Sequence, residues 1–319
     1  MSDSFGEAIN SPAGHLAEVL LKRFPESKED LSADFLARLS ILVDSPGRFG
    51  FLARVRLAAA IPFLFQRAPG WTKEKLIPMF DWSSSPDAAD AWSARKYSSW
   101  IGSPELFGLL KSSFLAMFER PDTPGEELRF FADWLGAILL ANQKDRTGFP
   151  LSPAEARSVL RRAGPRALTS LAHRLATEME AAKSEEKVER WRTAVAPVFK
   201  ATWPLDVDLQ SPATTFKLVQ IISAAGDAFP EAADLIIPFI RPERAQSHTT
   251  VYSIASFPEK YYTSSPQQVL DLLVAVIGEA PIGSVFSLNT ALTRLRDVAP
   301  KLTTTRKFQN LLNAASPHV

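Results

Sequence analysis

The chain of 319 residues contains no cysteine. Disulfide bonds, thiolate metal sites and cysteine nucleophiles are therefore excluded. The N-terminal sequence MSDSFGEAINSPAGHL has no basic segment followed by an apolar one, and so it does not predict a secretory signal. Both features favour a cytoplasmic location.

An excess of charge of one sign is also missing. The chain has 36 Lys and Arg against 35 Asp and Glu, which gives a formal net charge of +1. Proteins that bind a phosphate backbone usually show a clear basic excess, because phosphate contacts dominate that affinity. We therefore expect a protein partner rather than a nucleic acid.

Long hydrophobic runs are absent as well. The most apolar stretch is FLARVRLAAAIPFLF (51–65), and it contains Arg54 and Arg56. A helix that crosses a bilayer needs about 20 mostly apolar residues. The stretch therefore predicts a buried core helix, and no membrane partner is expected.

The familiar catalytic and phosphate-binding motifs do not occur. The sequence has no GxSxG, GxGxxG or GxxxxGK[ST]. The histidines are too far apart in sequence to form a local metal-binding pair: His15, His173, His248 and His318. We therefore predict no catalytic residue, no metal site and no cofactor.

Two groups of aspartates are candidates for acid–base chemistry. Asp206 and Asp208 alternate in PLDVDLQ, whereas Asp81, Asp87 and Asp90 cluster in DWSSSPDAAD. Paired carboxylates act as acid and base only in a pocket that separates their pKa values. Aspartates in loops are more typical of turns and caps. A hydrolase with an unrecognised carboxylate pocket is the enzymatic alternative.

Serine or threonine followed by proline recurs along the chain. A hydroxyl can accept from the first turn of a helix, and proline at the next position loses no hydrogen bond. Three of these pairs also have the spacing of a capping box, namely Thr123 with Glu126, Ser152 with Glu155, and Ser265 with Gln268. The pairs predict closely spaced helix starts after Ser11, Ser45, Ser85, Ser103, Thr123, Ser152, Ser211, Ser265 and Ser316.

Apolar residues follow these starts at helical spacing. After Ser265, for example, Val269, Leu272, Leu273 and Val276 fall on one helix face. Only TTVYSIAS (249–256) approaches the alternation of a strand, and we do not expect one there. The sequence predicts an all-α protein.

Proline stands inside five apolar runs: AIPFL (60–64), LIPMF (76–80), VAPVF (195–199), IIPFI (236–240) and VAPKL (298–302). Proline kinks or ends a helix. Kinked helices in stacked pairs would form an irregular α-solenoid similar to HEAT repeats. Alternatively, each proline ends a helix at a corner of a compact multi-helix domain, which at this length has a radius of gyration of about 20 Å.

The polar segment NQKDRTGFPLSP (142–153) is the best candidate for a joint. It predicts an N-terminal helical half over 1–150 and a C-terminal helical half over 151–319. One continuous helical array is the alternative.

Basic residues concentrate between 157 and 192. Arg157, Arg161, Arg162 and Arg166 are the candidate binding face, and Arg157 and Arg161 are four residues apart. Several glutamates are interleaved with the later basic residues of the span. This pattern favours a solvated, ion-paired face. The alternative is a nucleic-acid-sensing module that uses the span 157–192.

The chain resembles an uncharacterised bacterial helical domain over most of its length. The resemblance rests on AINSPAGHLAEVLL (8–21), APGWTKEKLIPMFDWSSSPDAADAWSARKYSSWIGSPELFGLLKSSFLAMFE (68–119), ISAAGDAFPEAADLIIPFIRPE (222–243) and FPEKYYTSSPQQVLDLLVAVIGE (257–279). That domain forms the C-terminal part of larger anti-phage defence proteins, where a sirtuin-like NAD-consuming domain often precedes it.

The resemblance implies a non-enzymatic interaction module, a sensor or scaffold of a bacterial anti-phage defence system. The expected partner is a protein, either an effector subunit or a phage component. The chain has no nucleotide-binding glycine loop and no histidine in a sirtuin context. The NAD chemistry of the resembled proteins is therefore assigned to no residue of this chain. We expect the chain to be either a fragment of a larger protein or a protein encoded separately from its effector.

Overall fold

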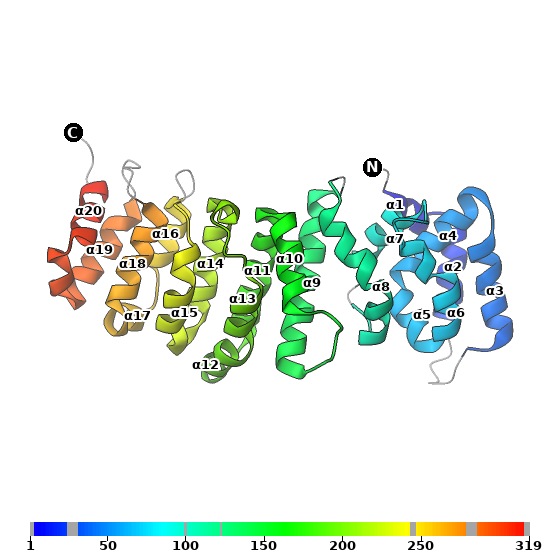
Figure 1. The fold of residues 1–319 in the computed structure, drawn as a ribbon, viewed down its shortest axis with the longest axis horizontal. Helices are drawn as coiled ribbons and strands as arrows, with labels where there is room; N and C mark the ends of the chain where they lie inside the picture. Colours follow the sequence, from blue (N-terminus) through cyan, green and yellow to red (C-terminus); the bar gives the residue numbers. More distant parts are fainter. Residues whose placement is uncertain are drawn as a thin grey trace. The chain divides into compact units, whose positions relative to one another are not determined.

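The computed structural model describes residues 3–23, 31–98, 101–121, 123–242, 247–278 and 286–315. Every regular element in these ranges is a helix, which confirms the all-α prediction (Figure 1). The segment 249–256 lies almost entirely within the helix Ser247–Ala255. The HEAT-like repeat stays a prediction.

The chain divides into two compact units. Unit 1 comprises Met1–Phe130 and Thr147–Leu151, and unit 2 comprises Phe131–Arg146 and Ser152–Val319. The chain passes from one unit to the other inside the helix α9 (Gly125–Asp145), after Phe130, and then twice within the segment 142–153, after Arg146 and after Leu151. That the two halves are separate domains stays a prediction.

The described residues of unit 1 form eight α-helices that precede α9, together with two 3-10 turns. In chain order these are α1 (Ser4–Ile9), α2 (Pro12–Lys22), α3 (Ala33–Asp44), α4 (Gly47–Ala59), α5 (Ile61–Arg67), α6 (Pro69–Lys75), η1 (Ile77–Phe80), α7 (Ala88–Arg95), α8 (Pro104–Ala116) and η2 (Met117–Glu119). The helix α4 packs against α1, α2, α3 and α7, and it is the central helix of the unit.

Aromatic side chains form part of the core of unit 1. The ring of Trp92 lies 5.1 Å from that of Phe80 and 6.0 Å from that of Phe114. The Trp92 indole N–H donates to the Phe80 carbonyl at 3.0 Å, so its polar atom is satisfied in the interior. Phe107 and Phe118 extend the cluster from Phe114. These contacts join η1, α7, α8 and η2.

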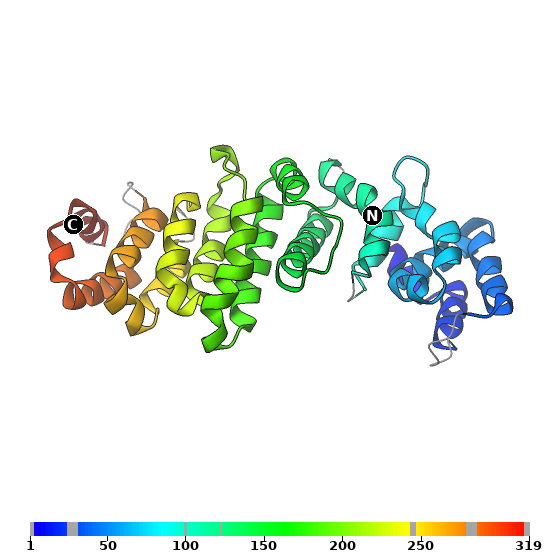
Figure 2. The ribbon, with the colours of Figure 1, turned by 60° about the horizontal axis from the view of Figure 1, so that its bottom comes forward.

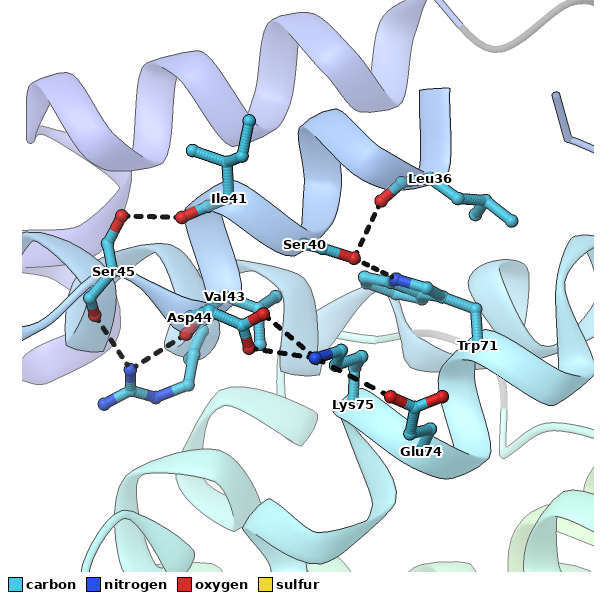
Figure 3. Close-up of polar contacts among 10 residues, drawn as sticks. Leu36, Ser40, Ile41, Val43, Asp44, Ser45, Trp71, Glu74 and Lys75 are labelled. Atoms are coloured by element: carbon cyan, nitrogen blue, oxygen red, sulfur yellow. Dashed lines mark hydrogen bonds and ion pairs between the residues drawn. The ribbon is translucent and has the colours of Figure 1, made fainter. Parts of the chain in front are cut away.

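Polar contacts tie α3 to α6, as Figure 3 shows. The Trp71 indole N–H donates to the Ser40 hydroxyl at 2.8 Å, and that hydroxyl donates to the Leu36 carbonyl at 2.9 Å. One turn further on, the Lys75 ammonium lies 2.9 Å from the Asp44 carboxylate. Ser40 and Asp44 are one turn apart on α3, and their partners Trp71 and Lys75 are one turn apart on α6. The two contacts together therefore fix the register of α6 on α3.

Unit 2 contains the rest of α9 and all later helices. These are α10 (Pro153–Ala163), α11 (Pro165–Ala181), η3 (Ser184–Glu186), α12 (Lys187–Arg190), the π-helical turn η4 (Trp191–Val195), α13 (Ala196–Thr202), η5 (Val207–Leu209), α14 (Pro212–Ala224), η6 (Gly226–Ala228), α15 (Phe229–Ile236), η7 (Ile237–Phe239), α16 (Ser247–Ala255), α17 (Glu259–Ser264), α18 (Pro266–Ile277), α19 (Phe286–Val298), η8 (Pro300–Thr304) and α20 (Arg306–Ala315). Within this unit, helices that follow one another in the chain lie side by side (Figures 1 and 2).

The helices α11 and α14 share the largest contact in unit 2. The apolar stripe Leu168, Leu171, Leu175 and Met179 of α11 is fully buried, as the sequence periodicity requires. At Gly136 of α9, an added Cβ would lie 3.0 Å from the side chains of Leu171 and Arg174. Glycine there allows α9 to approach α11 closely.

Proline interrupts the helices in three different ways. Pro62 begins α5 after a bend of 78° from α4, whereas Pro78 and Pro238 lie in the 3-10 turns η1 and η7. Pro197 stands in α13 directly after the π-helical turn η4, in a helical segment that continues without a break. A widened turn accommodates the missing N–H of a proline. The prolines therefore act in both ways that the sequence allowed, because some accompany a bend and others lie where a helix ends.

The predicted helix starts after Ser11, Ser103, Ser152, Ser211 and Ser265 are confirmed, because a helix begins at the proline that follows each of them. The hydroxyls of Ser11, Ser103, Ser152 and Ser211 accept from the first turn of α2, α8, α10 and α14. The capping box at Ser265 is wrong, because Ser265 makes no side-chain cap bond. Ser45 instead closes α3, and Ser316 lies outside the described residues.

No single helix in the described ranges is long and apolar enough to cross a membrane. The helices α4 and α5 reach that length and composition only when they are taken together, across their 78° bend. As predicted for 51–65, most of the apolar residues of these two helices are buried.

Candidate interaction surface and cavity

The four arginines of the predicted binding face lie along α10 and the first turn of α11, in unit 2. The Arg157 guanidinium donates to the Lys200 carbonyl at 2.9 Å, and Arg161 lies 2.5 Å from the Asp206 carboxylate. Arg162 and Arg166 are exposed. Arg157 and Arg161 therefore bind other parts of unit 2.

Three further arginines of the basic span form ion pairs. Arg174 pairs with Asp133, and its Nε donates at 2.9 Å. Arg190 pairs with Glu178, and Arg192 pairs with Glu231. These contacts connect helices of unit 2 and favour the ion-paired interpretation of the span over a phosphate-binding one.

The pairing of Arg161 and Asp206 fixes the loop 203–211, which connects α13 to α14. Trp203, 3% exposed, anchors the start of the loop, because its ring stacks on Phe199 with centroids 4.8 Å apart. Ser211 caps α14 at the other end. The loop is therefore held at its beginning, at its middle and at its end.

The anchored loop presents two aliphatic side chains to solvent. Leu205 is 70% exposed and Val207 is 64% exposed, the highest values of any described aliphatic side chain in unit 2. They alternate with Asp206, which turns back to Arg161. We call Arg161, Leu205, Asp206 and Val207 the loop surface. It combines apolar groups with an ion pair on a fixed backbone, which suits a protein contact.

The two aspartate groups differ in their surroundings. Asp81 closes a turn, since its carboxylate accepts from the Ser83 N–H and hydroxyl and from the Ser84 hydroxyl. These hydrogen bonds lower the pKa of Asp81. Asp87 pairs with Arg54 at 2.7 Å, and Asp206 pairs with Arg161. Asp90, by contrast, lines a cavity.

This cavity lies within unit 1 and has a volume of about 650 Å³. Asp90 and Tyr97 line it from α7 and the residues just after it, Trp82 from the loop before α7, and Glu126 from the first turn of α9. The spacing of the aspartates in the sequence did not identify this cavity. The lining residues come from Asp3, from the segment 82–97 and from the segment 120–127, so no local pattern records their meeting.

The histidines and acidic residues form no metal site in the described ranges, where no group of three or more His, Cys, Asp or Glu could hold a metal ion. His15 and His173 lie in α2 and α11. The side chain of His248 and all of His318 fall outside the described residues.

Comparison with known proteins gives one distant relative. The chain is 22% identical over 327 aligned residues to the uncharacterized protein y4cA of Sinorhizobium fredii (strain NBRC 101917 / NGR234). The match covers 99% of this chain and 26% of that protein, so the chain spans about a quarter of its relative's length. No protein-family model and no solved structure matches the chain.

Proposed function

We propose that this chain is a non-enzymatic helical interaction module, a sensor or scaffold that binds a partner protein. The observation that carries the proposal is the loop surface, where Leu205 and Val207 are exposed on a loop held by Trp203 and by the Asp206–Arg161 pair. Binding through a fixed loop loses little conformational entropy, and burial of aliphatic side chains supplies affinity.

The distant relative supports a modular role. Nearly the whole chain aligns with a quarter of a much longer protein, as expected for a helical segment that works beside other domains. The resemblance to helical domains of anti-phage proteins adds the biological setting. In this proposal the partner is an effector subunit or a phage component, and the module controls the effector's activity.

Affinity capture tests this function. The tagged chain is expressed in its host with and without phage infection, and captured proteins are identified by mass spectrometry. We expect a specific partner that the Leu205→Ser/Val207→Ser variant captures at least about tenfold less, as for truncation of interface hot spots.

The matched control removes two exposed side chains elsewhere, in Ile41→Ser/Tyr252→Ser. Ile41 is 67% exposed and Tyr252 is 65% exposed, so the control removes comparable apolar surface. Repeated recovery of the chain alone contradicts the function. Equal loss in both variants contradicts the assignment of the loop surface.

A further inference from the structure

The cavity in unit 1 carries more carboxylates than cations. Asp3, Asp90, Glu126 and Glu127 line it, together with Lys96 and Arg120. Lys96 is matched inside the cavity wall, because its ammonium lies 3.4 Å from Glu127 and the two side chains are 20% and 12% exposed. The remaining carboxylates give the cavity a negative potential, which walls of low dielectric concentrate.

Aromatic rings complete the walls, and contacts with other residues hold them in place. The Trp82 indole N–H donates to the Ser113 carbonyl at 2.8 Å, and the Arg120 guanidinium stacks 4.4 Å from the Trp82 ring. Tyr97 is 56% exposed and stacks on Phe5 with centroids 4.1 Å apart. Carboxylates beside fixed aromatic rings are the surroundings that a guanidinium or ammonium group prefers.

The geometry points to this cavity as the binding site for an arginine or lysine side chain of a partner protein. The cation would lie between the Asp90 and Glu126 carboxylates, with its aliphatic part against Tyr97. This inference rests on the proposed function, since it adds a second contact for a partner, in unit 1.

The size and polarity of the cavity favour a peptide over a small free cation. A volume of about 650 Å³ falls in the usual range for ligand pockets and exceeds what a single ammonium group fills. Ser93 and Thr123 also line the cavity. The Thr123 hydroxyl donates to the Met117 carbonyl at 2.9 Å, and its oxygen can still accept from a peptide N–H. A short extended segment with a central basic residue satisfies both features.

Selection from a displayed library of random heptapeptides tests the inference, and it requires no assumption about the partner's sequence. The full chain, Asp90→Asn/Glu126→Gln and the control Asp34→Asn/Glu74→Gln are each used as bait. The control changes the net charge equally, because it removes two carboxylates whose side chains are 77% and 75% exposed on α3 and α6. Circular dichroism verifies that all three proteins are folded.

We expect peptides rich in arginine or lysine to be enriched on the full chain and on the control, but not on the cavity variant. A fluorescent copy of the most enriched peptide should bind the cavity variant at least about tenfold more weakly, and its arginine-to-glutamine analogue should bind the full chain similarly weakly.

Any of four results overturns the inference. The selection enriches peptides without basic residues, or it enriches no peptide at all. The cavity variant binds the peptide as tightly as the full chain does, or spermine binds the full chain as tightly as the peptide and displaces it. The last identifies a site for a free organic cation. The loop-surface variants test the proposed function separately. If the library selection yields basic peptides but affinity capture yields no partner, only the proposed function is contradicted. If affinity capture yields a partner but no peptide binds in a cavity-dependent way, only this inference is contradicted.

Discussion

The phenol of Tyr262 lies in the interior of unit 2. It is fully buried, its hydroxyl donates to the Ile254 carbonyl at 3.0 Å, and the Arg294 guanidinium lies 3.9 Å from its ring centroid. Arg294 also donates to the carbonyls of Ala255 and Phe257 at 2.6 and 2.9 Å. These contacts join α16, α17 and α19 around one phenol ring.

Burial raises the pKa of Tyr262 from 10.0 to about 12. The folded state therefore keeps a proton that the unfolded state loses between pH 10 and 12. The stabilisation is fully present below pH 10 and declines as the pH rises toward 12, by about 2–3 kcal/mol in total. Tyr262→Phe should remove this decline, and it should lower the free energy of unfolding at pH 7 by about 1 kcal/mol through the lost hydrogen bond.

Urea unfolding between pH 8 and 11.5 measures both effects. The control is Tyr252→Phe, because Tyr252 is 65% exposed on α16. If the free energy of unfolding of Tyr262→Phe falls with pH as steeply as that of the unsubstituted chain, the pKa of Tyr262 is not the cause of the alkaline decline.

At the scale of elements, two serines with the same sequence pattern behave differently. Ser152 forms the full capping box of α10, since its hydroxyl accepts from the Glu155 N–H and the Glu155 carboxylate accepts from the Ser152 N–H. Ser265 follows α17 directly and has ψ 49°, whereas Ser152 has ψ 150°. With this backbone the Ser265 hydroxyl makes no bond to the first turn of α18, and the Gln268 amide donates to the Asp234 carboxylate instead.

We therefore expect Ser152→Ala to lower the free energy of unfolding by about 1 kcal/mol. Ser265→Ala should change it less, because no cap bond is lost. Urea denaturation followed by far-ultraviolet circular dichroism measures both variants. Equal losses would show that the cap bond of Ser152 contributes nothing.

The basic span illustrates the same limit of local patterns. The interleaved charges indicated ion pairs, yet the partners of Arg161, Arg174 and Arg192 lie 39 to 45 residues away in the chain. Arg157→Glu/Arg161→Glu would release the loop 203–211 as well as remove positive charge. The exposed Arg166 is a cleaner position for testing nucleic-acid binding.

At the scale of the whole molecule, each of the two units has its own core. Leu171 of α11 and Leu57 of α4 are both fully buried, one in each unit. Truncation of such a leucine to alanine removes about 2–5 kcal/mol of stability, because it leaves a cavity. Amide hydrogen exchange shows where that loss is felt.

We expect Leu171→Ala to accelerate exchange mainly in the helices of unit 2, and Leu57→Ala mainly in those of unit 1. Mass spectrometry of peptides from each unit provides the measurement. Acceleration spread evenly over the whole chain in both variants would show that the two units unfold as one cooperative body.

The sequence by itself determined the helical class and the starts of several helices, since these depend on hydrogen bonds and apolar spacing within one or two turns. Ser11, Ser103, Ser152 and Ser211 were predicted correctly for that reason. Only the tertiary structure decided how each proline bends the chain, which carboxylate each arginine meets, and that Trp82, Asp90 and Glu126 line one cavity. Those outcomes depend on packing between segments distant in the chain, where side-chain volume and desolvation select among many pairings that the sequence permits.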